Sequence, residues 1–168
     1  MTDQPTAAGK ANGQDTASQT NTQPIQIHGQ YVKDLSFENP TAPQSLLSGQ
    51  PAPRVDIGVN VQGGPVAEGV YEVMLNLRVQ AQVEQTTVFL IELAYGGVFS
   101  LPGIPPEHHR PVLLIEGPRL LFPFARAIVA DLVRDGGYPP LLLNPIDFAE
   151  LYRHQMAEAA AAQPQAQA

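Results

Sequence analysis

The sequence predicts an α+β fold, in which a four-stranded antiparallel sheet is covered on one face by a long helix and a second helix follows at the C-terminal end. Four segments between positions 25 and 99 alternate apolar and polar side chains with the two-residue period of half-buried strands. Helical periodicity follows only after about position 117. Strands first and helices last are typical of the α+β class, and strands with one polar face indicate a sheet covered on one side only.

The first two strands are expected over residues 25–38 and 54–62. Residues 25–38 (IQIHGQYVKDLSFE) place apolar side chains at most odd positions, with one lapse at Lys33, and Asn39-Pro40 ends the pattern. Residues 54–62 (RVDIGVNVQ) alternate more strictly. The next three residues, Gly63-Gly64-Pro65, predict a loop.

The third and fourth strands are expected over residues 70–83 and 87–99, joined as a hairpin at Glu84-Gln85. Gly96-Gly97 indicates a bulge or bend in the fourth strand. Strict alternation gives that strand a core face of Thr87, Phe89, Ile91, Leu93 and Tyr95, and a polar face of Val88, Leu90, Glu92 and Ala94. For Val88, an aliphatic side chain on the polar face, the pattern offers no reason beyond strand propensity.

The long helix is expected within residues 117–137, with Pro123 in its first turn and Gly136-Gly137 at its end. Residues 139–145 (PPLLLNP) are expected to be extended, and Asp147 begins an N-capping pattern for the final helix. The predicted core face of the long helix carries Leu121, Phe124, Ala125, Ile128, Leu132 and Val133.

The chain is expected to form one folded domain over residues 25–156 between two polar tails. Residues 1–24 have almost no large apolar side chain and are predicted to be disordered. Residues 157–168 are rich in Ala and Gln and are predicted to form a flexible tail, whose first part is open to a continuation of the final helix.

Composition narrows the range of partners. The net charge of −7 argues against nucleic acid and anionic membrane surfaces, since both repel an acidic protein, and favours a basic partner. The absence of cysteine excludes disulfides, thiolate metal sites and cysteine nucleophiles. The sequence has no secretory signal and no apolar stretch near the roughly 18 residues of a membrane span. We therefore expect a cytoplasmic protein without direct membrane insertion.

No pattern in the sequence marks an active site. Glu107-His108-His109 is the densest candidate for a metal site, but adjacent histidines on a helix point about 100° apart, and surface histidines near a helix start are the favoured interpretation. Ser100 lacks the surroundings of a nucleophile elbow, and the paired glycines do not form a phosphate-binding loop. We expect no catalytic residue, no metal and no cofactor.

Three segments together resemble the family of SecB-type protein-export chaperones. QYVKDLSFENPTAP, residues 30–43, resembles the first strand and turn of that family. VYEVMLNLRV followed by TVFLIELAYGGVFSLPGI, residues 70–79 and 87–104, resembles its central hairpin. LLFPFARAIVADLVRDGGYPPLLLNPIDFAELY, residues 120–152, resembles its long helix, crossover loop and final helix. The similarity runs in the family's order from about Ile25 to Gln155.

The resemblance implies a SecB-like holdase without catalysis or nucleotide. Its clients would be non-native preproteins, kept translocation-competent in the cytoplasm and delivered to the SecA motor. It also implies a homotetramer built as a dimer of dimers, in which sheets of two protomers join and the long helices lie between the dimers.

The resemblance also assigns site residues. The acidic surface of the family that docks SecA corresponds here to Asp34, Glu38, Leu90 and Glu92, all on the polar faces of their strands. The groove for clients is expected at Val55, Ile57, Val59, Leu141, Leu143 and Phe148.

A contact between dimers is expected at Ile91, Leu93 and Tyr95. Two alternatives stay open from the residues alone. One is a small-ligand binding domain with an apolar cavity under the sheet, and the other is metal-dependent hydrolysis at Glu107-His108-His109.

Overall fold

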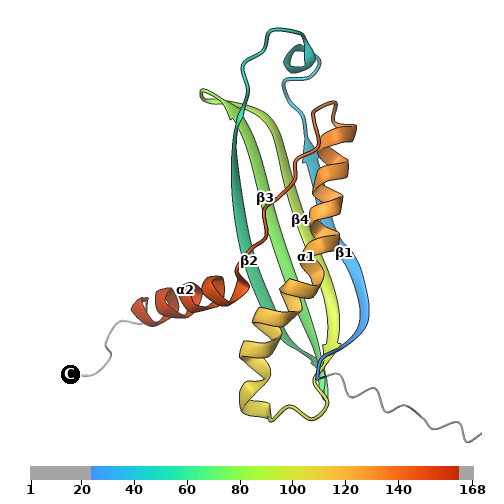
Figure 1. Cartoon of the computed structure of the whole chain (residues 1–168), viewed down its shortest axis with the longest axis vertical. Coiled ribbons are helices and arrows are strands. Elements are labelled where there is room, and N and C mark those ends of the chain that lie inside the picture. The colour runs from blue at the N-terminus through green and yellow to red at the C-terminus, as the bar shows by residue number, and fades with distance from the viewer. Residues whose placement is uncertain (1–23, 163–168) are drawn as a thin grey trace, which may run out of the picture.

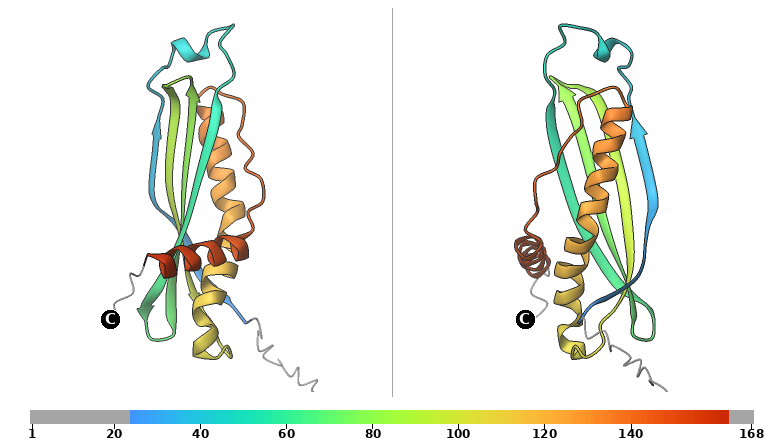
Figure 2. Two further views of the ribbon diagram at one scale, coloured as in Figure 1. Left: turned by 90° about the vertical axis from the view of Figure 1, so that its left-hand side faces the viewer. Right: turned by 45° about the vertical axis from the view of Figure 1, so that its right-hand side comes forward.

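The computed structural model of the protein describes residues 24–162 and has the predicted α+β architecture (Figure 1). The four strands form one antiparallel sheet in the order β1-β4-β3-β2. The elements are β1 (Gln26–Glu38), a 3-10 turn (Gln44–Leu46), β2 (Arg54–Ala67), β3 (Val70–Val83), β4 (Thr86–Ser100), a 3-10 turn (Pro106–His108), α1 (His109–Asp135) and α2 (Phe148–Ala161). The expectation of one covered face is confirmed, because α1 and the crossover segment 136–147 lie on the same side of the sheet (Figure 2).

The predicted tails fall mostly outside the described residues. This holds for residues 1–23 and 163–168. Helix α2 continues past position 156 to Ala161, so the final helix extends into the segment that was expected to be a flexible tail.

The core lies between α1 and the sheet. Most of its side chains come from β3, β4 and α1, and the most deeply buried include Val73, Leu75, Val79, Ile91, Phe99, Leu121, Ala125 and Val129. Burial of this apolar area is the main stabilising term that fixes the helix on the sheet.

Strand β1 departs twice from strict alternation. Its pairing with β4 shifts register at His28 and again at Lys33, so that β1 has an extra residue at each point. Because side chains alternate with period two, each extra residue moves the following side chains to the opposite face of the sheet. Between the two bulges the even-numbered residues of β1 therefore face α1 and the odd-numbered ones face away from it. Val32 therefore lies opposite Tyr95 on the helix-covered face, and Tyr31 points to the other face. The lapse at Lys33 in the sequence pattern is this bulge.

A third bulge lies in β4 at Val88. Phe89 pairs with Ala81 but Thr87 pairs with Gln82, which leaves Val88 as the extra residue. The placement of Thr87 on the core face was wrong, since the bulge reverses the alternation before it. Val88 is 7% exposed and belongs to the core, which accounts for an aliphatic side chain at this position.

Two loop or bend predictions were also wrong. Gly63-Gly64-Pro65 lies inside β2, which pairs with β3 as far as Ala67 before it turns at Gly69, where φ is +67°. Gly96 and Gly97 are paired without a register shift to both neighbouring strands. Their small size serves close packing instead: a Cβ on Gly96 would lie 2.7 Å from the Tyr31 ring, and one on Gly97 would lie 2.7 Å from the Phe99 ring.

Helix α1 begins at His109, at least two turns earlier than expected, so Pro123 lies in its interior and not in its first turn. Phe124 was placed on the core face but is 51% exposed, whereas Phe122 is 7% exposed. The predicted C-terminal end of α1 and the predicted start of α2 are confirmed. Gly136 caps α1, and the Asp147 carboxylate accepts hydrogen bonds at 3.0 Å from the first backbone N–H groups of α2.

Candidate functional site

The four residues assigned to SecA docking lie together on the sheet face that α1 does not cover, here called the outer face. Asp34 and Glu38 come from β1, and Leu90 and Glu92 come from the adjacent β4. Glu38 is directly opposite Leu90, and Glu92 is opposite Ser36, between the two β1 carboxylates. These four residues are called the docking patch below.

The carboxylates of the docking patch differ in their surroundings. Glu92 forms an ion pair with Arg78, the residue directly opposite it on β3. Within residues 24–162, neither Asp34 nor Glu38 has a basic partner. The sequence placed Arg78 on the polar face of its strand but did not indicate that it pairs with Glu92.

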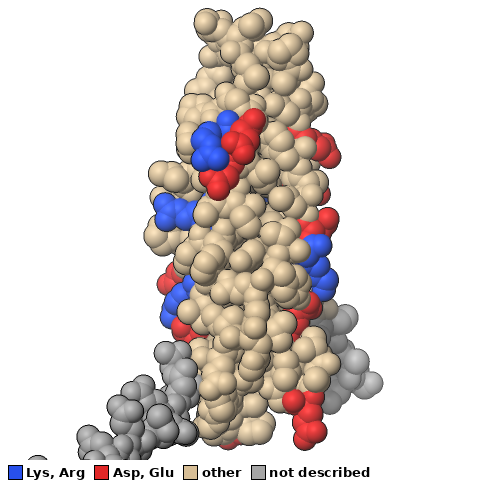
Figure 3. Space-filling model, turned by 90° about the vertical axis from the view of Figure 1, so that its right-hand side faces the viewer, with Lys and Arg blue, Asp and Glu red and all other residues tan. Residues whose placement is uncertain are grey.

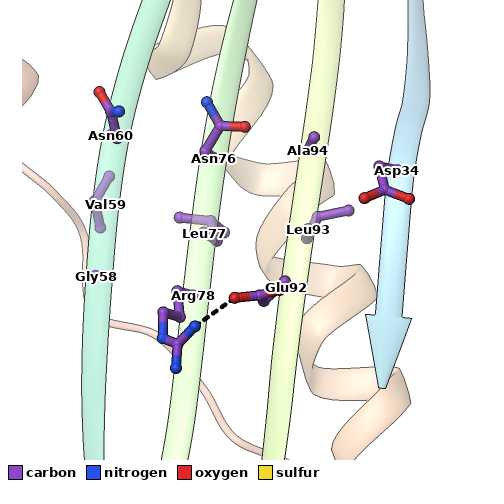
Figure 4. Close-up of a pocket in the computed structure, with 10 residues that line it drawn as sticks. All are labelled: Asp34, Gly58, Val59, Asn60, Asn76, Leu77, Arg78, Glu92, Leu93 and Ala94. Carbon is purple, nitrogen blue, oxygen red and sulfur yellow. Dashed lines mark hydrogen bonds and ion pairs between the residues drawn. The ribbon is translucent and has the colours of Figure 1, made fainter. Parts of the chain in front are cut away.

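A hollow of about 420 Å³ lies beside this ion pair (Figure 4). Asp34, Arg78 and Glu92 line it together with small residues, among them Gly58 and Ala94. Figure 4 shows the Arg78 side chain reaching from β3 toward Glu92, while Gly58 presents no side chain on β2. The outer face therefore has open space beside Arg78 and Glu92.

A second ionic cluster on the outer face links β1 to β3 across the intervening β4. The Tyr31 hydroxyl donates a hydrogen bond to the Glu72 carboxylate, and the Lys33 ammonium lies 3.0 Å from the same oxygen. The hydrogen bond to Glu72, followed by burial, raises the pKa of Tyr31 to about 12. The bonds from Tyr31 and then Lys33 lower the pKa of Glu72. Because Lys33 is engaged by Glu72, it does not neutralise its neighbour Asp34.

The residues assigned to the client groove separate into two groups. Val55, Ile57 and Val59 lie on the helix side of the edge strand β2, opposite core residues of β3, and Ile57 is 47% exposed. Leu141 is partly buried against the same core. Leu143 and Phe148 are 2% and 1% exposed, so both belong to the core of this chain and offer no surface to a client.

The residues of the predicted contact between dimers are also buried within the single chain. Ile91, Leu93 and Tyr95 are 0%, 2% and 8% exposed, because the chain's own α1 covers them. Among the apolar side chains that do reach the surface, four lie at the junction of β1 and α1: Val32, Leu35, Leu120 and Phe124. Figure 3 shows this side of the molecule, where a broad uncharged area lies between charged side chains near the margins.

The histidines do not form a metal site. His109 begins α1 and its ring is engaged on both sides, with Nδ1 2.8 Å from the Tyr71 hydroxyl and Nε2 2.7 Å from the Ile104 carbonyl oxygen. No group of three or more His, Asp or Glu side chains within residues 24–162 is arranged to hold a metal ion. In the same part of the chain, no helix has the length and apolar character needed to cross a membrane.

Comparison with known proteins gives a consistent result. The family model described as preprotein translocase subunit SecB matches residues 18–159. The protein-export protein SecB of Rhodospirillum centenum is 51% identical over 93% of each chain. The protein-export protein SecB of Mesorhizobium japonicum is 48% identical over 95% of this chain and 93% of its own. That of a Bradyrhizobium species is 54% identical over 83% of this chain and 86% of its own.

A solved structure supports the fold. It is a SecB-like chaperone of Mycobacterium tuberculosis in complex with a peptide from an antitoxin, with a TM-score of 0.60 at 17% identity. The match covers 73% of this chain and 90% of that one. At this identity the similarity establishes a common fold.

Proposed function

The chain belongs to the SecB family of protein-export chaperones, and from this premise we propose that it holds non-native preproteins in the cytoplasm and delivers them to the SecA motor. No catalysis is needed for such a role, and we propose that the chain is not an enzyme. The small-ligand alternative is not favoured, because the relatives are protein-export proteins.

Delivery requires a surface that the motor recognises, and the docking patch has the right chemistry for a basic segment. Its carboxylates lie on adjacent strands of an exposed face, and Leu90 adds a local apolar contact. The net charge of −7 favours approach of a basic partner at long range. We propose that the basic, zinc-bearing tail of SecA docks here and that the zinc belongs to the motor.

Holding requires an extended apolar surface, because unfolded chains have in common only backbone and apolar side chains. The helix side of β2 offers such a surface at Val55, Ile57 and Val59, next to the crossover segment that carries Leu141 and the 66% exposed Leu142. We propose that clients lie along this surface, and that Leu143 and Phe148 support it from the core.

We also propose that the protein is a homotetramer. The observation in support is the exposed apolar surface of Val32, Leu35, Leu120 and Phe124 at the junction of β1 and α1, since large uncharged areas of this kind favour association. Two copies can cover this surface mutually. Ile91, Leu93 and Tyr95 would then stabilise the interface from beneath, as part of the core.

Isothermal titration tests the holdase role. We expect the purified full chain to bind a reduced, unfolded preprotein and to bind the folded form of the same preprotein far more weakly. Equal affinity for both forms would rule out the proposal. Co-purified lipid or another hydrophobe, together with no affinity for unfolded chains, would instead favour a small-ligand binding domain.

A further inference from the structure

Arg78, beside the docking patch, carries a positive charge that opposes the function proposed for the patch. The carboxylate of Glu92 is occupied by the Arg78 guanidinium, whereas Asp34 and Glu38 have no basic partner within residues 24–162. A basic partner that approaches the patch therefore meets two available carboxylates on β1 and one compensated carboxylate on β4.

The pair is held by its position in the sheet. Arg78 and Glu92 are directly opposite each other on β3 and β4, a cross-strand arrangement that brings side chains into contact. Gln80, two residues along the same face of β3, accepts a long hydrogen bond of 3.4 Å from the same guanidinium, and its own amide donates to Thr87 at 3.1 Å. The ion pair is thus the resting arrangement of Arg78.

The structure also leaves space into which Arg78 can withdraw. On the other side of Arg78 its partner on β2 is Gly58, which has no side chain, and the hollow of about 420 Å³ extends over both residues. One guanidinium nitrogen forms the hydrogen bond to Glu92, and the Arg78 side chain is 53% exposed. A half-exposed pair with a single hydrogen bond is weak enough to exchange partners.

We propose that Arg78 competes internally with the basic partner for Glu92. In the free chaperone Arg78 occupies Glu92, and a cation of the docking segment displaces it toward Gly58. This inference rests on the proposed docking of SecA at the patch. Its consequence is selectivity, because a segment with one cation gains only Asp34 or Glu38, while a segment with several cations also displaces Arg78.

The expected effect is modest, since exposed ion pairs are individually weak. Removal of the competitor is expected to tighten binding of the docking segment by about three- to fivefold. It is also expected to steepen the dependence of affinity on salt, because one more carboxylate then contributes to the attraction.

The experiment uses the full chain and the zinc-loaded basic tail of SecA as a labelled peptide, with affinity measured by fluorescence anisotropy at several salt concentrations. The variants are Arg78→Ala and Arg78→Gln. Arg119→Ala is the matched control, since it removes the same charge from a side chain that is also 53% exposed and paired, but on α1. A thermal unfolding curve for each variant verifies that it is folded.

Tighter binding by both Arg78 variants but not by Arg119→Ala supports the competition, provided that the gain disappears in the Glu92→Gln background. Unchanged or weaker binding by the Arg78 variants overturns it, as does an equal gain from Arg119→Ala. Asp34→Asn separates the two proposals. If Asp34→Asn does not weaken binding, the docking surface itself is wrong and the competition falls with it; if Asp34→Asn weakens binding while Arg78→Ala has no effect, only the competition is wrong.

Discussion

The Arg78 guanidinium on β3 lies against the carboxylate of Glu92, its direct neighbour on β4, at the β3 edge of an acidic patch. On β1, Asp34 and Glu38 extend from the same face without a basic partner in the described part of the chain. The patch is therefore asymmetric, with two available carboxylates at one side and a compensated one beside them. Substitutions on β1 and β4 are expected to have different consequences.

Charge reversal at Glu92 is expected to weaken SecA binding by about tenfold and to leave client binding intact. Glu92→Lys removes a carboxylate and places two cations opposite each other, which repels a basic segment. Isothermal titration with SecA and with an unfolded preprotein measures both affinities. The wild-type affinity for SecA is expected to fall with added salt. A salt-independent affinity, or no loss on charge reversal, would contradict the docking proposal.

The hydrogen bond between Tyr31 and Glu72 is expected to make the stability of the fold fall at alkaline pH. The pKa of Tyr31 is raised to about 12, first by its hydrogen bond to Glu72, so the native state keeps a proton that the unfolded chain releases near pH 10. Stability therefore falls as pH rises from about 10 to about 12, because the native state binds more protons there. Urea denaturation of Tyr31→Phe should show less of this fall than wild type.

Tyr152→Phe is the control for the alkaline experiment. Its hydroxyl has no hydrogen bond within residues 24–162, so this variant should lose stability over the same pH interval as wild type does. An identical pH dependence for Tyr31→Phe and wild type would mean that the Tyr31–Glu72 bond contributes nothing to folding.

The fold could be predicted from the sequence because hydrophobic periodicity indicates which face of a strand is covered. The alternation of residues 70–83 agrees with the burial of β3, where Val73, Leu75 and Val79 are 0% exposed. The bulges could not be predicted, because one extra residue changes the sequence pattern only by a single lapse in the alternation, such as the one at Lys33. The prolines at positions 118 and 123 also concealed the early start of α1, because proline normally marks the first turn of a helix.

The neighbours of the docking patch were also beyond prediction from the sequence. Counting outward from the Glu84-Gln85 hairpin with no bulge would place Arg78 opposite Ile91, a polar residue against a core residue. The bulge at Val88 shifts the register by one and brings Arg78 opposite Glu92. Alternation placed the acidic residues on one face, but the position of Arg78 beside Glu92 could be found only from the register of the folded sheet.

Gly96 is expected to be required for the position of Tyr31. A methyl group there would lie 2.7 Å from Cζ of Tyr31 and 3.0 Å from Cε of Met74, which forces the ring away from Glu72. Gly96→Ala is expected to lower the free energy of unfolding by about 1–3 kcal/mol. The cost should be much smaller in a Tyr31→Ala background, which chemical denaturation of the four proteins measures as a coupling energy. If Gly96→Ala lowers the free energy of unfolding equally in both backgrounds, a clash between the new methyl group and Tyr31 is excluded.

Self-association is expected to depend on the exposed surface between β1 and α1. Phe124→Asp places a charge on a side chain that is 51% exposed in the single chain, so the protomer should fold while association weakens. Light scattering is expected to show a smaller mass than wild type at the same concentration. Leu142→Asp, at a 66% exposed position on the crossover segment, is the control and should keep the wild-type mass. An unchanged mass for Phe124→Asp would place the interface elsewhere.

Client binding is expected to depend on Ile57 but not on Val66, although both are exposed aliphatic residues of β2, at 47% and 57%. Ile57 lies opposite core residue Val79 on the side that faces the crossover segment, whereas Val66 lies at a bulge beside the turn to β3. Ile57→Asp should weaken binding of an unfolded preprotein by about tenfold, since a charge in an apolar groove must be desolvated. Val66→Asp carries the same charge change on the same strand, and its affinity, measured by the same titration, should remain that of wild type. If both variants weaken binding equally, general charge repulsion and not the groove explains the effect.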